Sequence, residues 1–206
     1  MLKRKVAENL RHPKGLFGLL LATLMNVFNR TIIRESIEQI PEESCHRIIE
    51  VGIGSGKGLK LLSHRFPQSE IIGVDISETM LKRASKRNNA SIKAGKMKLQ
   101  LNPIEQMEVE SGSVDTLLTI NTLYFWNDPS KVCQEIYRVL KPMGYFIVSF
   151  NPGESMNKEA YPSDIFSFYS VDEVHQLLTD SNFSISSTKM IADSIENYAC
   201  VVAQKS

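Results

Sequence analysis

The sequence predicts an α/β protein: a doubly wound, seven-stranded, mainly parallel sheet with a C-terminal antiparallel hairpin, preceded by an N-terminal helical extension. Short apolar runs alternate with helical patterns from residue 41 onward, which is typical of a parallel sheet with helices on both faces. Glycines at every second position from 52 to 58 follow the first run, as expected for a ligand-binding turn. Two strand-like runs near the C-terminus have only a turn between them, so they must pair antiparallel.

The elements follow in a regular order. Strands are expected over 47–51, 70–76, 97–101, 114–121, 145–150, 183–190 and 197–203. Helices are expected over 57–66, from Ser77 to about 89, over 129–140 and over 171–179. The run 70–76 is almost entirely apolar, as in a parallel strand buried on both faces. Pro67 and Pro142 end the first and third helices, and Ser77 and Ser170 supply caps to the second and fourth.

Size and composition favour one well-cored domain. The chain has 206 residues, of which 42% are hydrophobic, so we expect one domain over 41–206 and a helical extension or lid over 1–40. The formal net charge of +1 predicts no general attraction to nucleic acid. Residues 79–104 carry seven basic side chains and no acidic one, which indicates a solvated helix face or, alternatively, a patch for an anionic substrate.

The cysteines indicate neither a disulfide framework nor a zinc site. Cys45, Cys133 and Cys200 are odd in number and far apart, and no CxxC pair occurs. This usage fits a cytoplasmic protein. The four histidines are isolated in sequence, so no metal-ligand cluster is expected.

The N-terminal extension contains an apolar stretch, Leu16 to Phe28, that is too short for the roughly 20 residues of a membrane span. No small-x-small cleavage site follows it, so a signal sequence is not indicated. We interpret it as a helix that covers the core or the active site. Because basic residues flank it within 3–34, peripheral contact with a membrane is the alternative.

The spacing of the glycines excludes two nucleotide-binding loops. A dinucleotide fingerprint would need glycine at position 57, which is Lys57. A P-loop ending at Gly56-Lys57 would need its first glycine at Val51 and a hydroxyl residue at Gly58. The segment Glu50-x-Gly52-x-Gly54-x-Gly56 instead resembles the first motif of the class I S-adenosylmethionine-dependent methyltransferases.

That resemblance extends over almost the whole chain, as far as the helix before the final hairpin. Asp75 follows Gly56 by 19 residues, Arg138 to Pro142 resembles the family's stretch before strand 5, and the terminal hairpin is typical of the family. Met143 stands where a glycine is usual, which we expect to matter little in a turn. The resemblance implies S-adenosylmethionine as the cofactor and a small bacterial-type member of the family.

The resemblance also implies a cofactor site at the carboxyl ends of the strands. Asp75 would bind both ribose hydroxyls, or it would simply form a helix-capping turn with Ser77. Glu50 would orient the loop or reach the methionyl ammonium through water, or it would cap the loop's own amides. The full set of expected cofactor residues is Glu50, Gly52, Gly54, Gly56, Asp75, Ile76, Asn102, Ile104 and Asn121.

The acceptor is less explicit in the sequence. Tyr124 and Trp126 are candidates for the substrate pocket, although both would also suit packing against the following helix. His12 and Tyr124 are the candidate catalytic side chains, in a displacement that needs few of them. The segment Asn121 to Tyr124 lies where base-methylating enzymes carry Asn-Pro-Pro-Tyr, but both prolines are absent, so nucleic acid is not expected as a partner.

These observations lead to one functional hypothesis and two alternatives. The hypothesis is methyl transfer from S-adenosylmethionine to a small-molecule acceptor by in-line displacement. A non-catalytic protein that keeps the fold and acts through a partner is the first alternative. A methyltransferase that acts on a membrane lipid or a quinone-like acceptor is the second. The sequence does not define the oligomeric state.

Overall fold

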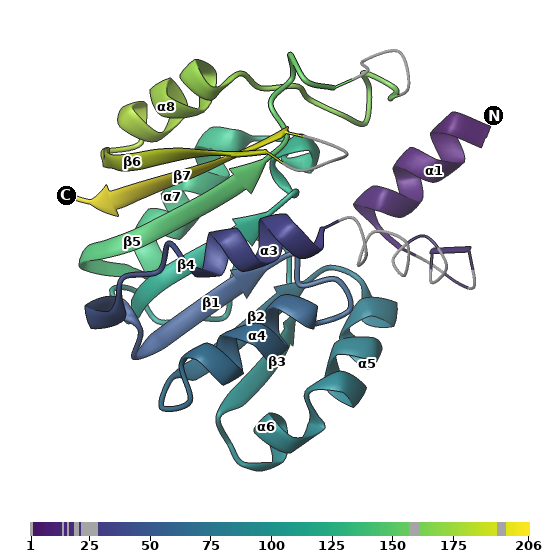
Figure 1. The fold of residues 1–206 in the computed structure, drawn as a ribbon. Helices are drawn as coiled ribbons and strands as arrows, with labels where there is room; N and C mark the ends of the chain where they lie inside the picture. Colours follow the sequence, from purple (N-terminus) through teal and green to yellow (C-terminus); the bar gives the residue numbers. More distant parts are fainter. Residues whose placement is uncertain are drawn as a thin grey trace.

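The computed structural model describes residues 2–13, 15, 17, 18, 21, 29–156, 161–192 and 197–206, and it contains the predicted seven-stranded sheet. The strands lie in the order β3-β2-β1-β4-β5-β7-β6 (Figure 1). Their bounds are β1 Arg47–Val51, β2 Glu70–Asp75, β3 Met97–Leu101, β4 Val114–Ile120, β5 Leu140–Phe150, β6 Phe183–Ala192 and β7 Asn197–Lys205. The predicted turn around Asp193 lies outside the described residues.

The pairing of the strands confirms the predicted fold class. The strands β3, β2, β1, β4 and β5 pair parallel, whereas β7 pairs antiparallel with both β5 and β6. The chain order reverses between β1 and β4, so a crevice is expected at the carboxyl ends of these two strands.

Helices cover both faces of the sheet. Their bounds are α1 Leu2–Arg11, α3 Arg30–Ile37, α4 Lys57–Arg65, α5 Glu78–Arg87, α6 Asn89–Lys93, α7 Pro129–Val139 and α8 Val171–Asp180, with short 3-10 turns η1 Glu42–Ser44 and η2 Leu123–Phe125. Buried residues of α3, α4 and α5 form one apolar cluster with the sheet, and residues of α7 and α8 form another on the opposite face. In the view of Figure 1, α3 lies in front of the sheet and α1 stands beyond the carboxyl ends of the parallel strands.

Several ends differ from the sequence-based expectation by one or two residues, and two differences change the elements themselves. The second helix ends at Arg87 and is followed by the separate short helix α6, because Asn88 leaves the helical conformation and caps Gly56 and Ala84 with its side chain. The fifth strand begins at Leu140, earlier than the expected start at 145. Its register with β4 shifts between Val114 and Thr116, and the extra residues 141–144 bulge out.

The bulge places Met143 in an unusual conformation. Its φ is 62°, in the left-handed region that favours glycine, and its side chain is 60% exposed. The next residue is a true glycine: a Cβ at Gly144 would lie 2.9 Å from the carbonyl oxygen of Lys141. The bulge therefore stores backbone strain at Met143 that side-chain packing does little to offset, so the expectation that a non-glycine residue matters little here was wrong.

Among the described residues, no helix combines the length and apolarity needed to cross a membrane.

Candidate active site

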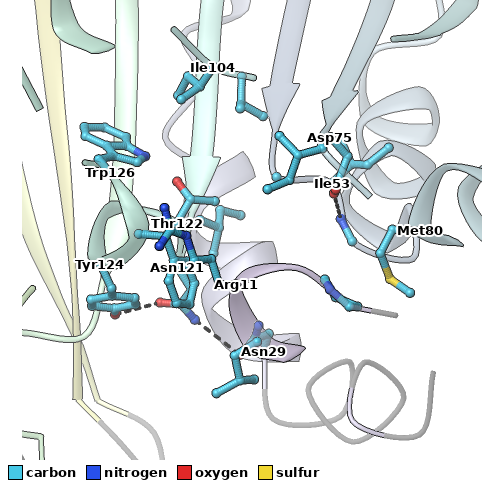
Figure 2. Close-up of a pocket in the computed structure, with 18 of the residues that line it drawn as sticks. Arg11, Asn29, Ile53, Asp75, Met80, Ile104, Asn121, Thr122, Tyr124 and Trp126 are labelled. Atoms are coloured by element: carbon cyan, nitrogen blue, oxygen red, sulfur yellow. Dashed lines mark hydrogen bonds between the residues drawn. The ribbon is translucent and has the colours of Figure 1, made fainter. Parts of the chain in front are cut away.

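A cavity of about 400 Å³ opens at the carboxyl ends of β1, β2 and β4, where the strand order reverses. One half is lined by the glycine loop, the end of β2 and the segment after β3. The other half is lined by the segments after β4 and β5 and by the N-terminal segment around Arg11. Figure 2 shows Asp75, Ile104, Asn121 and Tyr124 around this one cavity. Its volume lies within the usual range for small-molecule sites.

The three glycines of the loop have different physical roles. All have positive φ, at 73° for Gly52, 49° for Gly54 and 74° for Gly56. A Cβ at Gly52 would clash with the methyl group of Thr122, and a Cβ at Gly56 would lie 2.7 Å from that of Ala84. A Cβ at Gly54 would meet nothing within 4 Å. Gly52 and Gly54 line the cavity, whereas Gly56 packs against α5 outside its lining.

Asp75 lies at the end of β2 and is held by the glycine loop. Its Oδ2 accepts a hydrogen bond from the backbone N–H of Gly54 at 3.0 Å, and its Oδ1 accepts one from Ser77 at 2.8 Å. Burial raises the pKa of Asp75 to about 6, although these backbone N–H groups act in the opposite direction. Asp75 thus forms the capping turn with Ser77 and also lines the cavity.

Glu50 is the most deeply buried carboxyl group of the site. It lies under the start of α4, where a Cβ at Gly58 would clash with its Oε1. Its Oε2 has no hydrogen-bond partner among the described residues. Burial raises the pKa of Glu50 to about 8, and the negative charge of Asp75 adds to this increase. Glu50 is therefore protonated at neutral pH unless a cation enters the cavity.

The expected adenine-contacting residues line the same half of the cavity. Ile76 is half-exposed at its mouth, and Ile104 is buried at its wall. Asn102 uses its Nδ2 to donate a hydrogen bond of 3.4 Å to Glu108, and its Oδ1 is the remaining side-chain acceptor. Together they offer two apolar surfaces and one amide oxygen to a planar ligand.

The end of β4 carries a hydrogen-bonded network. Asn121 has a φ of 56°, and its Nδ2 donates to Asn29 Oδ1 at 3.3 Å. The hydroxyl of Tyr124 donates to Asn121 Oδ1 at 3.1 Å and accepts a hydrogen bond from the backbone N–H of Asn151. The network therefore connects Tyr124 to the residues that follow β4 and β5. Figure 2 shows the part of it that joins Tyr124, Asn121 and Asn29.

Aromatic rings line the second half of the cavity. Phe166 stacks on Tyr124 with ring centroids 5.7 Å apart and meets Phe125 edge-on at 4.7 Å. Tyr161 lies 4.6 Å from Phe166. Trp126 completes this wall, and its buried Nε1 has no hydrogen-bond partner among the described residues. Tyr124 and Trp126 thus line the cavity and pack in the core at the same time.

The N-terminal segment contacts both halves of the cavity mouth. Arg11 donates to Asn127 Oδ1 at 2.8 Å, and Arg4 forms an ion pair of 2.8 Å with Asp164. On the other side, Ser77 Oγ donates to the carbonyl oxygen of Pro13 at 2.8 Å. His12 is not among the residues that line the cavity.

Sequence reasoning missed several residues of the site. Arg11, Asn29 and Phe166 line the cavity, but each comes from a segment without a local motif. Most of the apolar stretch Leu16 to Phe28 lies outside the described residues. Within the described part of the chain, no group of His, Cys, Asp and Glu residues could hold a metal ion.

Comparison with known proteins gives a consistent result. A family model described as a methyltransferase domain matches residues 49–148. "Uncharacterized methyltransferase YdaC" of Bacillus subtilis is 30% identical over 145 residues, which are 70% of this chain and 76% of that protein. The "Ubiquinone/menaquinone biosynthesis C-methyltransferase UbiE" of Rickettsia akari is 33% identical over 153 residues, 70% of this chain and 60% of that protein.

A solved structure shares the fold. The S-adenosylmethionine-dependent methyltransferase of Aquifex aeolicus superposes with a TM-score of 0.69 at 20% identity, covering 86% of this chain and 89% of that one. The chain belongs to the class I S-adenosylmethionine-dependent methyltransferases. Its cofactor is S-adenosylmethionine, and the open backbone at Gly54 and the carboxylate of Asp75, which both line the cavity, fit that molecule.

Proposed function

We propose that this protein transfers the methyl group of S-adenosylmethionine to a small-molecule acceptor. The observation that carries the proposal is the continuity of one cavity, which joins the Gly54–Asp75 half to the aromatic half at Tyr124. The methyl donor would occupy the first half, the cofactor half, and the acceptor would occupy the second, the acceptor half. Both would then share one water-poor space. Holding two reactants in an attack geometry supplies most of what a methyl displacement requires.

The residues of this chain would divide the work between binding and positioning. Asp75 would accept hydrogen bonds from the two ribose hydroxyls, and Gly54 would let the cofactor lie against the backbone. Glu50 would lose its proton and become the counter-charge of the cationic methionyl part of the ligand. The bound cofactor supplies an electrophilic methyl group. Asn121 and Tyr124, fixed by their hydrogen bond, would border the place of transfer.

We further propose that residues 1–40 form a lid over the site. The contacts of Arg11 with Asn127 and of Pro13 with Ser77 bridge the acceptor half and the cofactor half. Ala7 and Leu10 of α1 pack against the apolar cluster that contains Tyr124 and Trp126. A segment that touches both halves would exclude water once both ligands are bound.

A methyl-transfer screen tests the proposal. The protein would be incubated with S-adenosylmethionine labelled on the methyl carbon and with representatives of several metabolite classes, and labelled product would be separated. Transfer to one class, lost in Asp75→Ala, is the expected result. Cofactor binding without transfer to any class would favour the alternative of a non-catalytic protein that acts through a partner, since a fold does not fix a function.

A quinone-like or lipid acceptor is the second candidate. It is favoured by the aromatic lining of the acceptor half and by the relative named as a ubiquinone and menaquinone C-methyltransferase. Co-sedimentation with anionic liposomes separates a membrane-borne acceptor from one in solution. No binding at low salt would contradict a membrane contact through residues 3–34.

A further inference from the structure

We propose that the acceptor is a hydroxylated aromatic ring, recognised through Trp126 and Asn151. This inference rests on the proposed function and names the substrate class of the same site. It is carried by the shape of the aromatic half, by two buried polar atoms without partners, and by the distribution of charge around the cavity.

The first step concerns the surface that a substrate would meet. Tyr124, Phe125, Tyr161 and Phe166 form a continuous set of ring contacts along the acceptor half, with centroid separations between 4.6 and 6.0 Å. Aromatic surfaces bind planar apolar ligands by offset stacking and edge contacts. A ring therefore suits this half of the cavity better than a flexible polar chain.

The second step concerns hydrogen bonding. Nε1 of Trp126 is a donor and Oδ1 of Asn151 is an acceptor, and neither has a partner among the described residues, although both side chains are more than nine-tenths buried. Both residues line the cavity, and Figure 2 shows the indole nitrogen of Trp126 on the side of the ring that faces the cavity centre. Buried polar groups are rarely left unpaired in native proteins. A hydroxyl group is both acceptor and donor, so it has the chemistry to accept from the indole N–H and to donate to the amide oxygen.

The third step concerns charge. The carboxyl groups that line the cavity, Glu50, Asp75 and Glu105, all belong to the cofactor half. Among the described residues that line the acceptor half, Arg11 carries a permanent charge, and that charge is positive. An ammonium group placed there would be buried without a counter-ion, at a high energetic cost. A phenol or phenolate group is neutral or negative when it binds, so it meets no such penalty.

A single tryptophan makes the inference directly testable. Trp126 is the one tryptophan in the sequence, so its fluorescence reports on the acceptor half alone. Protein saturated with S-adenosylhomocysteine would be titrated with 4-ethylphenol, ethylbenzene and 2-phenylethylamine. These probes share a ring and differ in carrying a hydroxyl, no polar group or an ammonium. We expect a saturable change in Trp126 emission with 4-ethylphenol, at an affinity about tenfold above that of the other two probes.

Two variants assign the interaction to its atoms. Trp126→Phe replaces the indole with a smaller aromatic ring that has no N–H group, and Asn151→Ala removes Oδ1 while the backbone N–H that binds Tyr124 stays. By calorimetry, each should weaken 4-ethylphenol binding about tenfold and leave ethylbenzene and S-adenosylhomocysteine unaffected. Tyr137→Phe, on α7 and outside the cavity lining, is the control and should change nothing.

The outcomes separate the two levels of the proposal. If the wild-type protein does not bind S-adenosylhomocysteine, the proposed function fails. If it binds the cofactor product but binds 4-ethylphenol no better than the amine, or binds it equally well in Trp126→Phe, the acceptor class is wrong while the proposed function stands.

Discussion

The backbone N–H of Gly54 donates a hydrogen bond of 3.0 Å to Oδ2 of Asp75, which joins the loop after β1 to the end of β2. Both residues line the cavity, so this bond connects two parts of the wall of its cofactor half. Gly54 also differs from its neighbours in the loop. Open space surrounds the position of its missing Cβ, whereas Gly52 and Gly56 each face a protein side chain. Gly54 is therefore the glycine at which a ligand would touch the backbone.

Gly54→Ala should weaken S-adenosylmethionine binding by at least about tenfold, since the new methyl group would project into the cavity. The matched control is Gly95→Ala. Gly95 also has a positive φ, at 72°, and its Cβ would also meet nothing within 4 Å, but it lies between α6 and β3, away from the cavity. Both variants should lose about 1 kcal/mol of stability, and calorimetry should show lost affinity in the first alone. Equal affinities for the two variants would contradict the role of Gly54.

Glu50 should make the stability of the ligand-free protein fall with rising pH. Below its ordinary pKa of 4.5 the carboxyl group is protonated in both the folded and the unfolded state. Between 4.5 and about 8 the unfolded state is ionised and the folded state keeps its proton, so folding becomes less favourable as pH rises. The expected slope from this group is up to about 1.4 kcal/mol per pH unit.

Urea unfolding at pH 5, 6, 7 and 8, with Glu50→Gln beside the wild type, checks this expectation. The amide cannot ionise, so the variant should lose this part of the slope and be the more stable protein at pH 8. Glu43→Gln, at an exposed position, should follow the wild-type curve. A parallel pH dependence in wild type and Glu50→Gln would show that Glu50 is ionised in the folded state.

Met143→Gly should stabilise the protein by about 1 kcal/mol, because it removes left-handed strain from a residue with a φ of 62°. The side chain is 60% exposed, so little packing is lost. Met190→Gly is the control, at an equally exposed position of 59% in β6, where glycine should destabilise the strand. Chemical denaturation measures both changes, and a loss of stability in Met143→Gly would contradict the strain argument.

The individual strands and the glycine loop could be predicted because their signals are local. Apolar runs such as 70–76 mark buried parallel strands, and the spacing of Gly52, Gly54 and Asp75 follows from what a ligand-binding turn requires. The same reasoning did not find the early start of β5. That start depends on a register shift against β4, and a shift between two strands has no signature in either one.

The acceptor half shows the limit of sequence reasoning more clearly. Tyr124 and Trp126 could be predicted from the sequence because they follow the end of a predicted strand, β4. Phe166 and Arg11 were not, because they reach the cavity only through packing between distant segments. The different roles of Gly54 and Gly56 also depend on the neighbouring helix α5, which spacing alone does not place.

Calorimetric titration with S-adenosylmethionine tests the central claim most directly. The wild type should bind one equivalent, and Asp75→Ala should lose at least about tenfold in affinity, because the ribose hydroxyls lose their charged acceptor. Asp172→Ala, an exposed carboxylate on α8, is the control and should bind as the wild type does. Unchanged affinity in a folded Asp75→Ala variant, or no binding by the wild type at millimolar cofactor, would contradict the assignment of this cavity.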